Sequence, residues 1–305
     1  MPRAARAAMG SPWAAPVSPR VRSSPVSSGD GSAWSVPSPR TARYSQSLER
    51  GLAILGCFTP KRPVLGITDI ADLLGMAGST THRYVSTLVS LGYLERDVSR
   101  KYRLGLRVTD LGMSALNSTG MREHAHRYLQ ELRQRTSYAA SLGVLDGTDV
   151  LYVDRVPGFR RLRGGIELEL RTGSRLPAYC TAMGKLLLST MPAPERGEVT
   201  EEMKLTKRGP NTITRKRALR EELAKMPAVG YAVSDQELAA ELLMVAAPVW
   251  NGAREICAAV DLEAHSSMIS LEGLVGGLVP HLITTAGQIS ARLGYRRDDE
   301  IPGGR

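Results

Sequence analysis

Apolar residues recur at helical spacing in the first part of the chain that is not dominated by Pro and Ser. The spacing predicts a helix that begins at Ser45 and ends before Pro60. A second helix is expected from Thr68, which would serve as its N-terminal cap, to Gly75. The apolar positions that we expect to face inward are Leu48, Leu52, Leu55 and Phe58 in the first helix and Ile70, Ala71 and Leu74 in the second.

A third helix and a hairpin follow the second helix after a short turn. Ser79 is a candidate cap for a helix that runs to Leu91, is closed by Gly92 and turns Tyr84, Val85 and Leu88 inward. Residues 93–96 and 100–104 are expected to be strands joined at 97–99. This order of elements is typical of a helix-turn-helix followed by a wing.

The pattern changes from helical to alternating in the C-terminal part of the chain. A linking helix and an amphipathic helix from Met121 to about Arg135 come first. The remaining segments predict an α+β domain of the sensor type, with strands in runs and helices on their faces. Its expected strands are 139–145, 150–156, 166–170, 231–234, 243–249 and 256–262, and its expected helices are 182–190, 195–203, 214–225 and 270–293, the last bent at Pro280.

Composition separates an N-terminal tail from the folded part. Residues 1–43 are crowded with Pro, Ser, Ala and Arg, cannot bury much apolar surface and are expected to be disordered. The tail lacks the apolar stretch of a secretory signal; it resembles a transit peptide only in being rich in Arg, and it could equally be an upstream extension. We therefore expect a tail at 1–43, a winged helix-turn-helix at 44–105, a linker helix at 106–120, a sensor domain at 121–298 and a flexible end at 299–305.

The net charge of +10 suggests a polyanionic partner. Most of the excess of basic over acidic residues lies in the first 118 residues, where the expected helix-turn-helix is. A basic tail alone would account for half of this excess. The three cysteines are widely separated, which favours neither disulfides nor a zinc site and fits a reducing cytoplasm. No apolar run is long enough to span a bilayer. We expect no metal, no cofactor and no catalytic residue.

The expected third helix carries the side chains that could contact DNA. Short hydroxyls, an imidazole and a guanidinium on one face could read bases in a major groove, while cations of the wing hold phosphates. Three-helix cores also occur in proteins that never bind DNA, so the spacing alone leaves both interpretations open. The candidate DNA-binding residues are Ser79, Thr80, Thr81, His82, Arg83, Ser86, Arg100, Lys101 and Arg103.

Several runs resemble the IclR family of transcriptional regulators. They include Tyr44–Leu52, Ser79–Arg83 with the following Leu88 and Gly92, Tyr102–Gly105, Pro177–Lys185 and Ala246–Val249. The resemblance extends from about Tyr44 to Asp298. Runs such as 152–156, 176–181, 205–214 and 291–297 look like the subgroup that controls aromatic catabolism through protocatechuate, 4-hydroxybenzoate and β-ketoadipate.

The resemblance implies a winged helix-turn-helix joined to a GAF-like domain that binds a small organic acid. The carboxylate of the effector would be held by the backbone N–H groups of Ala182 and Met183 at a helix start, where the helix dipole favours an anion. Ser234, Met244, Asp261 and Glu263 would line the pocket. On the alternative interpretation Thr181 merely caps the helix and Met244 is part of the core.

Four positions depart from the pattern of the family. Asp261 and Glu263 replace small or neutral residues and would repel an anion unless a proton, a cation or an Arg compensates. Glu241 lies where relatives often have Gly, and Gly78 where they often have a basic residue. The side chains that could neutralise the two carboxylates are those of Arg155, Arg160, Arg161 and Arg163, although such a cluster can equally be a solvated surface.

We therefore expect a cytoplasmic homodimer, or dimer of dimers, that binds a double-stranded operator and a small organic acid. An IclR-like regulator with an altered or unresponsive pocket is the alternative. Two other classes stay open: an enzyme that uses Cys180, whose pKa a nearby helix start could depress, and a ligand-binding protein that has lost contact with DNA.

Overall fold

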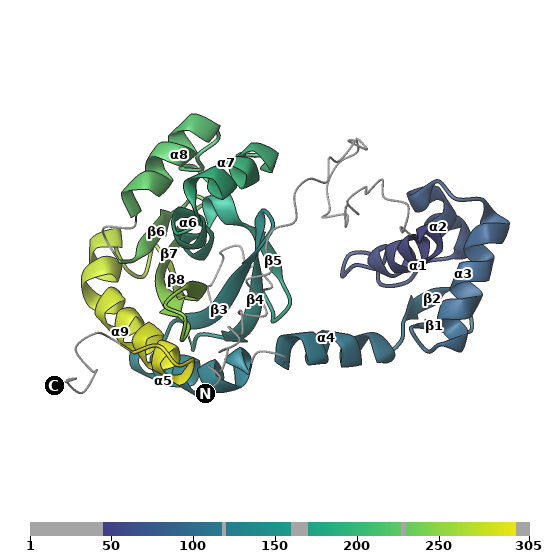
Figure 1. The fold of residues 1–305 in the computed structure, drawn as a ribbon, viewed down its shortest axis with the longest axis horizontal. Coiled ribbons are helices and arrows are strands. Elements are labelled where there is room, and N and C mark those ends of the chain that lie inside the picture. The colour runs from purple at the N-terminus through teal and green to yellow at the C-terminus, as the bar shows by residue number, and fades with distance from the viewer. Residues whose placement is uncertain (1–44, 118–119, 160–169, 227–229, 297–305) are drawn as a thin grey trace, which may run out of the picture. The chain divides into compact units, whose positions relative to one another are not determined.

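The computed structural model describes residues 45–117, 120–159, 170–226 and 230–296. The chain divides into two compact units, and the boundary between them lies between Ala115 and Leu116 in the sequence. Figure 1 shows the elements of each unit. The tail expected at 1–43, most of the strand expected at 166–170, the cluster of Arg160, Arg161 and Arg163 and the end at 299–305 lie outside the described residues.

The N-terminal unit is the predicted winged helix-turn-helix, extended by a further helix. Its core contains buried residues from all three predicted helices and from both strands of the hairpin. Leu94 pairs with Leu104 and Arg96 with Tyr102 in the antiparallel hairpin. The elements are α1 (Gln46–Gly56), α2 (Ile67–Leu74), α3 (Gly78–Ser90), β1 (Leu94–Arg96), β2 (Tyr102–Leu104) and α4 (Arg107–Asn117).

The inward face of α1 differs from the prediction. Leu48 and Leu52 are exposed by 63% and 43%, whereas Ile54 is fully buried and Cys57 nearly so. The predicted stripe does include Phe58, which is buried. The apolar positions of α1 cover more of the helix circumference than its partners α2 and α3 can cover, so periodicity alone placed the buried stripe wrongly.

Two predicted helix caps are also wrong. Gly66, not Thr68, precedes α2, and the carboxylate of Asp69 accepts a hydrogen bond from the Gly66 N–H at 2.8 Å. Ser79 is the second residue of α3, which begins after Ala77 and has no capping side chain. The opposite ends follow the prediction, since Gly75 and Gly92 both adopt positive φ, the left-handed conformation that glycine tolerates best.

The C-terminal unit is built on one antiparallel sheet of six strands in the order β5-β4-β3-β8-β7-β6. The short strand β5 and the 3-10 turn η1 were not predicted. The elements are α5 (Met121–Thr136), β3 (Ala139–Asp146), β4 (Asp149–Val156), β5 (Arg175–Pro177), η1 (Ala178–Cys180), α6 (Ala182–Ser189), α7 (Ala193–Glu202), α8 (Lys216–Lys225), β6 (Ala232–Asp235), β7 (Leu242–Trp250), β8 (Ile256–His265) and α9 (Leu271–Arg292).

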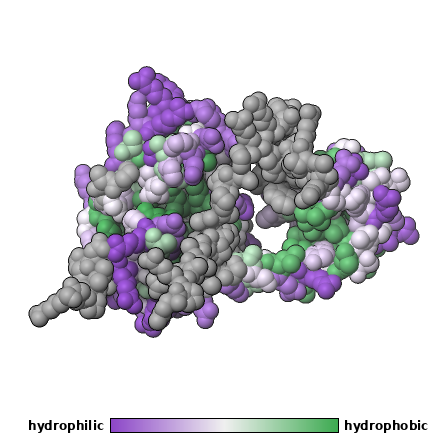
Figure 2. All heavy atoms as spheres, viewed as in Figure 1, coloured by the Kyte–Doolittle hydropathy of each residue, from purple (hydrophilic) through white to green (hydrophobic). Residues whose placement is uncertain are grey.

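Helices cover both faces of this sheet (Figure 1). Helices α5 and α9 pack on one face through a core that includes Leu129, Leu142 and Leu282. Helix α6 packs on the other face, through a core that includes Met183 and Leu187, and α8 packs against α6. Hydrophilic residues cover the outer surfaces of α7 and α8, as Figure 2 shows in purple. The arrangement agrees with the predicted α+β class.

One irregularity in β4 changes the direction of its side chains. Ser141 pairs with Arg155 and Leu142 with Asp154, but Gly143 pairs with Tyr152, so Val153 is an extra residue in the ladder. A bulge of this kind lets two residues three positions apart share a face. Tyr152 and Arg155 therefore both lie on the α6 face, while Val153 belongs to the core under α5 and α9.

Glu241, at the turn before β7, has a φ of 62°, which non-glycine residues rarely adopt. Its carboxylate lies 3.2 Å from the Nε2 atom of His265, but the side chain is 57% exposed, so this pair contributes little. We expect Glu241→Gly to raise the free energy of unfolding by about 0.5 to 1 kcal/mol, because the backbone strain is relieved. Chemical denaturation measures the change.

Gly147→Ala is the matched control for that substitution. Gly147 has the same φ of 62°, and an added Cβ would meet no atom within 4 Å, so only backbone strain is introduced. The control is expected to lower the free energy of unfolding by about 1 kcal/mol. A loss of stability in Glu241→Gly of similar size would show that the side chain of Glu241 matters more than its backbone conformation.

Candidate functional site

Helix α3 presents a polar outer face that agrees in most positions with the sequence analysis. Ser79, His82, Arg83 and Ser86 are exposed, and Thr80 is half-buried. The imidazole of His82 lies 3.4 Å from the Ser86 hydroxyl, so these two side chains form a small hydrogen-bonding group on one turn. Such a face can donate to and accept from base edges in a major groove.

Thr81 does not belong to this face, and its prediction as a DNA-binding residue is wrong. Its side chain is fully buried, and its hydroxyl donates to the backbone carbonyl of Ala77 at 3.2 Å. The physical reason is helical spacing, because Thr81 lies four and seven residues before Val85 and Leu88, which are both buried. The adjacent positions in the same run point outward.

The wing carries two exposed cations at its turn and a third cation that is already paired with a carboxylate. Arg100 and Lys101 are exposed at the turn, which the carboxylate of Asp97 organises by accepting from the Ser99 hydroxyl at 2.7 Å and the Lys101 N–H at 2.9 Å. Arg103 is also exposed, but both its Nε and Nη2 atoms donate to Glu95 on the neighbouring strand. The charge of Arg103 is therefore partly neutralised before any partner arrives.

In the C-terminal unit, the start of α6 forms the second candidate site. The hydroxyl of Thr181 accepts from the Gly184 N–H at 3.2 Å, as a capping residue does. The backbone N–H groups of Ala182 and Met183 have no acceptor among the described residues, although both residues are fully buried. Buried donors without an acceptor at a helix start are suited to an anion.

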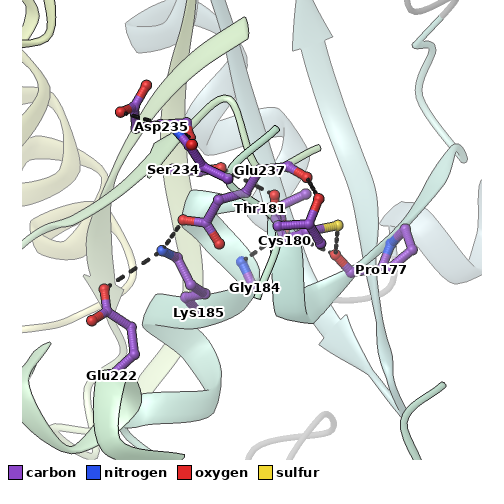
Figure 3. A network of polar contacts seen from close by, with 11 residues as sticks. Pro177, Cys180, Thr181, Gly184, Lys185, Glu222, Ser234, Asp235 and Glu237 are labelled. Carbon is purple, nitrogen blue, oxygen red and sulfur yellow. Dashed lines mark hydrogen bonds and ion pairs between the residues drawn. The ribbon is translucent and has the colours of Figure 1, made fainter. Parts of the chain in front are cut away.

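The next two residues, Gly184 and Lys185, hold α6 in place. A Cβ at Gly184 would lie 2.3 Å from backbone atoms of Ala178, so only glycine allows this approach of α6 to η1. Lys185 is buried and forms an ion pair with Glu237 and a longer contact of 3.7 Å with Glu222 (Figure 3). The ion pair ties α6 to the segment after β6. No pattern in the sequence pointed to Glu237.

Ser234, Met244 and Glu263 are brought together by the register of the sheet. Ser234 pairs with Met244, and Met244 pairs with Glu263, so the three form one row across β6, β7 and β8. Asp261 lies two residues before Glu263 and therefore on the same face. The hydroxyl of Ser234 donates to the Cys180 carbonyl at 3.0 Å, which places this row beside the start of α6 (Figure 3).

The two carboxylates on this face are compensated in different ways. Arg155 forms two hydrogen bonds with Glu263, at 2.6 and 2.9 Å, and a third with the Ser141 hydroxyl at 3.0 Å. Asp261 is fully buried, and burial together with the charge of Glu263 raises its pKa well above the usual value, although Arg155 opposes the rise. The neutral acid is thus the favoured form of Asp261.

The geometry does not support the expectation that the pKa of Cys180 is depressed. Cys180 is fully buried, and its burial raises the pKa of the thiol to about 12. Within the described residues, no group of three or more His, Cys, Asp or Glu side chains could hold a metal ion. None of the described helices is both long and apolar enough to cross a membrane.

Two family models match this chain. The IclR helix-turn-helix domain matches residues 47–98, and the model described as "Bacterial transcriptional regulator IclR C-terminal" matches residues 113–291. The chain belongs to the IclR family. It is therefore a DNA-binding transcriptional regulator with an effector-binding C-terminal domain.

Three curated relatives illustrate the range of the family. The transcriptional regulator XynR of Escherichia coli is 34% identical over 73% of this chain and 88% of its own length. The Pca regulon regulatory protein of Pseudomonas putida is 30% identical over 82% and 84%. The p-hydroxybenzoate hydroxylase transcriptional activator of Acinetobacter baylyi is 31% identical over 82% and 92%. The names of the last two relatives support the aromatic-catabolism subgroup.

Two solved structures share the fold. A transcriptional regulator from Rhodococcus is 35% identical, with a TM-score of 0.72 over 82% of this chain and 98% of that one. An IclR homologue from Microbacterium hydrocarbonoxydans, complexed with 4-hydroxybenzoate, is 27% identical, with a TM-score of 0.71 over 81% and 99%.

We expect all three thiols to be unreactive in the folded protein. Burial raises the pKa of Cys57, of Cys180 to about 12 and of Cys257 to about 11, so each is a neutral thiol at pH 8. Ellman's reagent should therefore react only after denaturation. Rapid modification of the native protein that disappears in Cys180→Ser would reveal an activated thiol and reopen the possibility of an enzyme.

Proposed function

We propose that this member of the IclR family controls transcription by inserting α3 into the major groove of an operator. The observation that carries the proposal is the outer face of α3, which combines Ser79, His82, Arg83 and Ser86 on one side of a helix whose other side is buried. Arg83 is the side chain on this face best suited to a bidentate contact with guanine.

The wing supplies contacts of a different kind. Arg100 and Lys101 are exposed cations in the turn of the hairpin that follows α3, and strand β1 of this hairpin packs against α3. Contacts with phosphates position a protein on DNA without reading its sequence. We assign Lys101 and Arg100 to the phosphates and give Arg103 a smaller part, because it is already paired with Glu95.

We propose that the protein acts as a homodimer or a dimer of dimers. Two reading helices that occupy successive major grooves require a two-fold arrangement and a palindromic site. The N-terminal unit also leaves large apolar side chains exposed, which indicates a surface that a second copy could cover. These side chains are Leu48 and Leu52 of α1, Leu106 just before α4, and Leu111 and Met113 within α4, where Figure 2 shows hydrophobic surface.

In the C-terminal unit, we propose that a small organic acid binds between the start of α6 and the sheet. Its carboxylate would accept from the N–H groups of Ala182 and Met183, which otherwise lack an acceptor among the described residues. Ser234, Met244, Asp261 and Glu263 share the sheet face that α6 covers. Arg155 neutralises Glu263, so the carboxylates of this face need not exclude an anion.

The proposed ligand is an aromatic acid or a related intermediate. Two relatives support this class by their names, which mention the Pca regulon and p-hydroxybenzoate hydroxylase, and the homologue from Microbacterium hydrocarbonoxydans was solved with 4-hydroxybenzoate. The alternative is a regulator whose pocket has changed its specificity or its response. Asp261 and Glu263 favour this alternative, since they add buried carboxylates to the site.

Two substitutions separate base reading from phosphate contact. Arg83→Ala is expected to reduce discrimination between the operator and scrambled DNA by about 1 to 3 kcal/mol. Lys101→Ala should weaken binding to both DNAs similarly and make its salt dependence less steep. Fluorescence anisotropy with the upstream intergenic region and a scrambled duplex, at several salt concentrations, measures both effects.

Arg217→Ala is the control for the loss of one positive charge. Arg217 is 91% exposed on α8, and Glu221 in the same helix is its one ion-pair partner among the described residues. Its substitution should leave binding to both duplexes unchanged. Equal affinity of the wild-type protein for operator and scrambled DNA would contradict sequence-specific binding, and identical behaviour of the two variants would contradict the division of roles.

The anion site at α6 can be tested by removing one N–H group. Ala182 is the first residue of α6, where proline fits the helical φ, and Thr181 before it has the extended conformation that a following proline requires. We expect Ala182→Pro to weaken binding of 4-hydroxybenzoate at least about tenfold, since one charge-assisted hydrogen bond is lost.

Isothermal titration calorimetry measures this change, and circular dichroism verifies that the fold persists. Because Ala182 is fully buried, Ala182→Ser serves as a second variant that keeps the N–H group and alters the side chain. Binding should survive in the serine variant. Equal binding by the wild-type and proline proteins would contradict a carboxylate at this helix start.

A further inference from the structure

The sheet face under α6 contains two buried polar groups without partners. The two carboxylate oxygens of Asp261 have no hydrogen-bonding partner among the described residues, and the hydroxyl of Tyr152 has none either. Both residues are fully buried. Leaving a buried polar group unpaired is costly, so such groups are rare and often mark the place of a ligand.

The register of the sheet brings these two groups close to one another. Tyr152 pairs with Gly143, which in turn pairs with Ala259, and Asp261 lies two residues after Ala259 on the same face. The bulge at Val153 is what turns Tyr152 to this side together with Arg155. The pKa of Tyr152 is raised first by burial and then by negative charge on Asp261 and on Glu263. This effect agrees with the short distance of both carboxyl groups from Tyr152.

The neighbouring protein groups do not satisfy Asp261. Ser141 is its direct cross-strand partner and, as a nearby donor, lowers the pKa of Asp261. The Ser141 hydroxyl accepts a hydrogen bond from Arg155 at 3.0 Å and still has a proton to donate, but neither oxygen of Asp261 lies in hydrogen-bonding geometry with a described group. Arg155 directs Nη1 and Nη2 to Glu263. Asp261 therefore lies beside an ion pair that is complete without it.

The side chains around the two groups are small. Gly143, Ala246 and Ala259 lie on the same face, and Ala246 is the cross-strand partner of Asp261. These small residues lie between Tyr152 at one end and the row of Ser234, Met244 and Glu263 at the other. The flexible side chain of Met183 covers Gly143, where an added Cβ would lie 3.0 Å from its Sδ and Cε atoms, so a ligand on this face would displace it. The hydroxyl of Ser234 contacts Cys180, which immediately precedes the cap of α6.

We propose that Tyr152 and Asp261 bind a neutral hydroxyl or carbonyl oxygen of the effector, at the end of the ligand opposite its carboxylate. The inference rests on the proposed function, in which the carboxylate is held at the start of α6. It narrows the ligand class to monocarboxylic acids that carry such an oxygen. Tyr152 is a specificity-determining residue in this proposal.

The charge of the site disfavours a second carboxylate at this end. Arg155 is neutralised by Glu263, so the group formed by Arg155, Glu263 and a protonated Asp261 has no net positive charge to offer. A neutral oxygen can accept from the phenol or the carboxylic acid, and a hydroxyl can also donate to the acid. A carboxylate would be desolvated without a compensating cation.

Two series of ligands test the proposal in the full-length protein. The aromatic series is benzoate, 4-hydroxybenzoate and terephthalate, and the aliphatic series is hexanoate, its terminal hydroxy derivative and adipate. Calorimetry should show, in at least one series, that the hydroxylated acid binds about tenfold or more tightly than both the parent acid and the dicarboxylate. Equal or tighter binding of the dicarboxylate would overturn the inference.

Variants connect this preference to the two side chains. Tyr152→Phe should remove most of the preference for the hydroxylated acid and leave binding of the parent acid unchanged. Asp261→Asn keeps a neutral group that donates and accepts, and should retain the preference, whereas Asp261→Ala should lose it. A preference that survives both Tyr152→Phe and Asp261→Ala would contradict the assignment.

The stability of the ligand-free variants gives a second readout. Since the Tyr152 hydroxyl has no partner among the described residues, Tyr152→Phe should leave the unfolding midpoint unchanged or raise it. A marked decrease would show that the hydroxyl serves the fold and not a ligand. If the parent acids bind but the hydroxyl group brings no gain, this inference fails and the proposed function stands. If no acid of either series binds, this inference and the proposed acid site at α6 both fail, and only the proposed binding of DNA stands.

Discussion

The close approach of Gly184 to Ala178 fixes where α6 begins, and the arrangement of the C-terminal unit depends on it. Because no side chain separates the two backbones, the first turn of α6 is held against η1 and over the sheet. The buried ion pair between Lys185 and Glu237 secures the same turn from the other side. Removing one partner of a buried pair typically costs about 3 to 5 kcal/mol, because the other charge is left buried and unpaired, so neither Lys185 nor Glu237 can be replaced alone without loss of stability.

This fixed turn explains why buried polar groups can persist on the sheet below it. A helix that could slide toward the sheet would press further apolar side chains against Ser141, Asp261 and Tyr152, which are already fully buried. Instead the first turn presents two backbone donors, and the sheet presents an ion pair and two unpartnered polar groups. Preorganised polar groups of this kind sacrifice some stability for the ability to bind.

Much of the fold could be predicted from the sequence, because helical and alternating periodicity survive in long elements such as α5, β3 and α9. Errors occurred where the decisive contacts are remote in sequence. Leu48 and Leu52 satisfy the helical pattern but pack into no core of the described chain. Thr81 is a different case, because its helical spacing to Val85 and Leu88 already indicated that it is buried. The short strand β5 has too few residues to show any period. The pairing of Arg155 with Glu263 depends on strand register, which no local pattern contains.

The bulge in β4 has a consequence for how relatives of this chain are compared. On either side of Val153 the strand alternates normally, but the two segments are out of phase by one residue. Suppose that a relative without the extra residue is aligned to this chain with no gap. All aligned residues on one side of Val153 would then lie on opposite faces of the sheet in the two proteins. Equivalence of pocket residues between such proteins can therefore be established only by superposing backbones, since a gap-free alignment would exchange pocket and core positions.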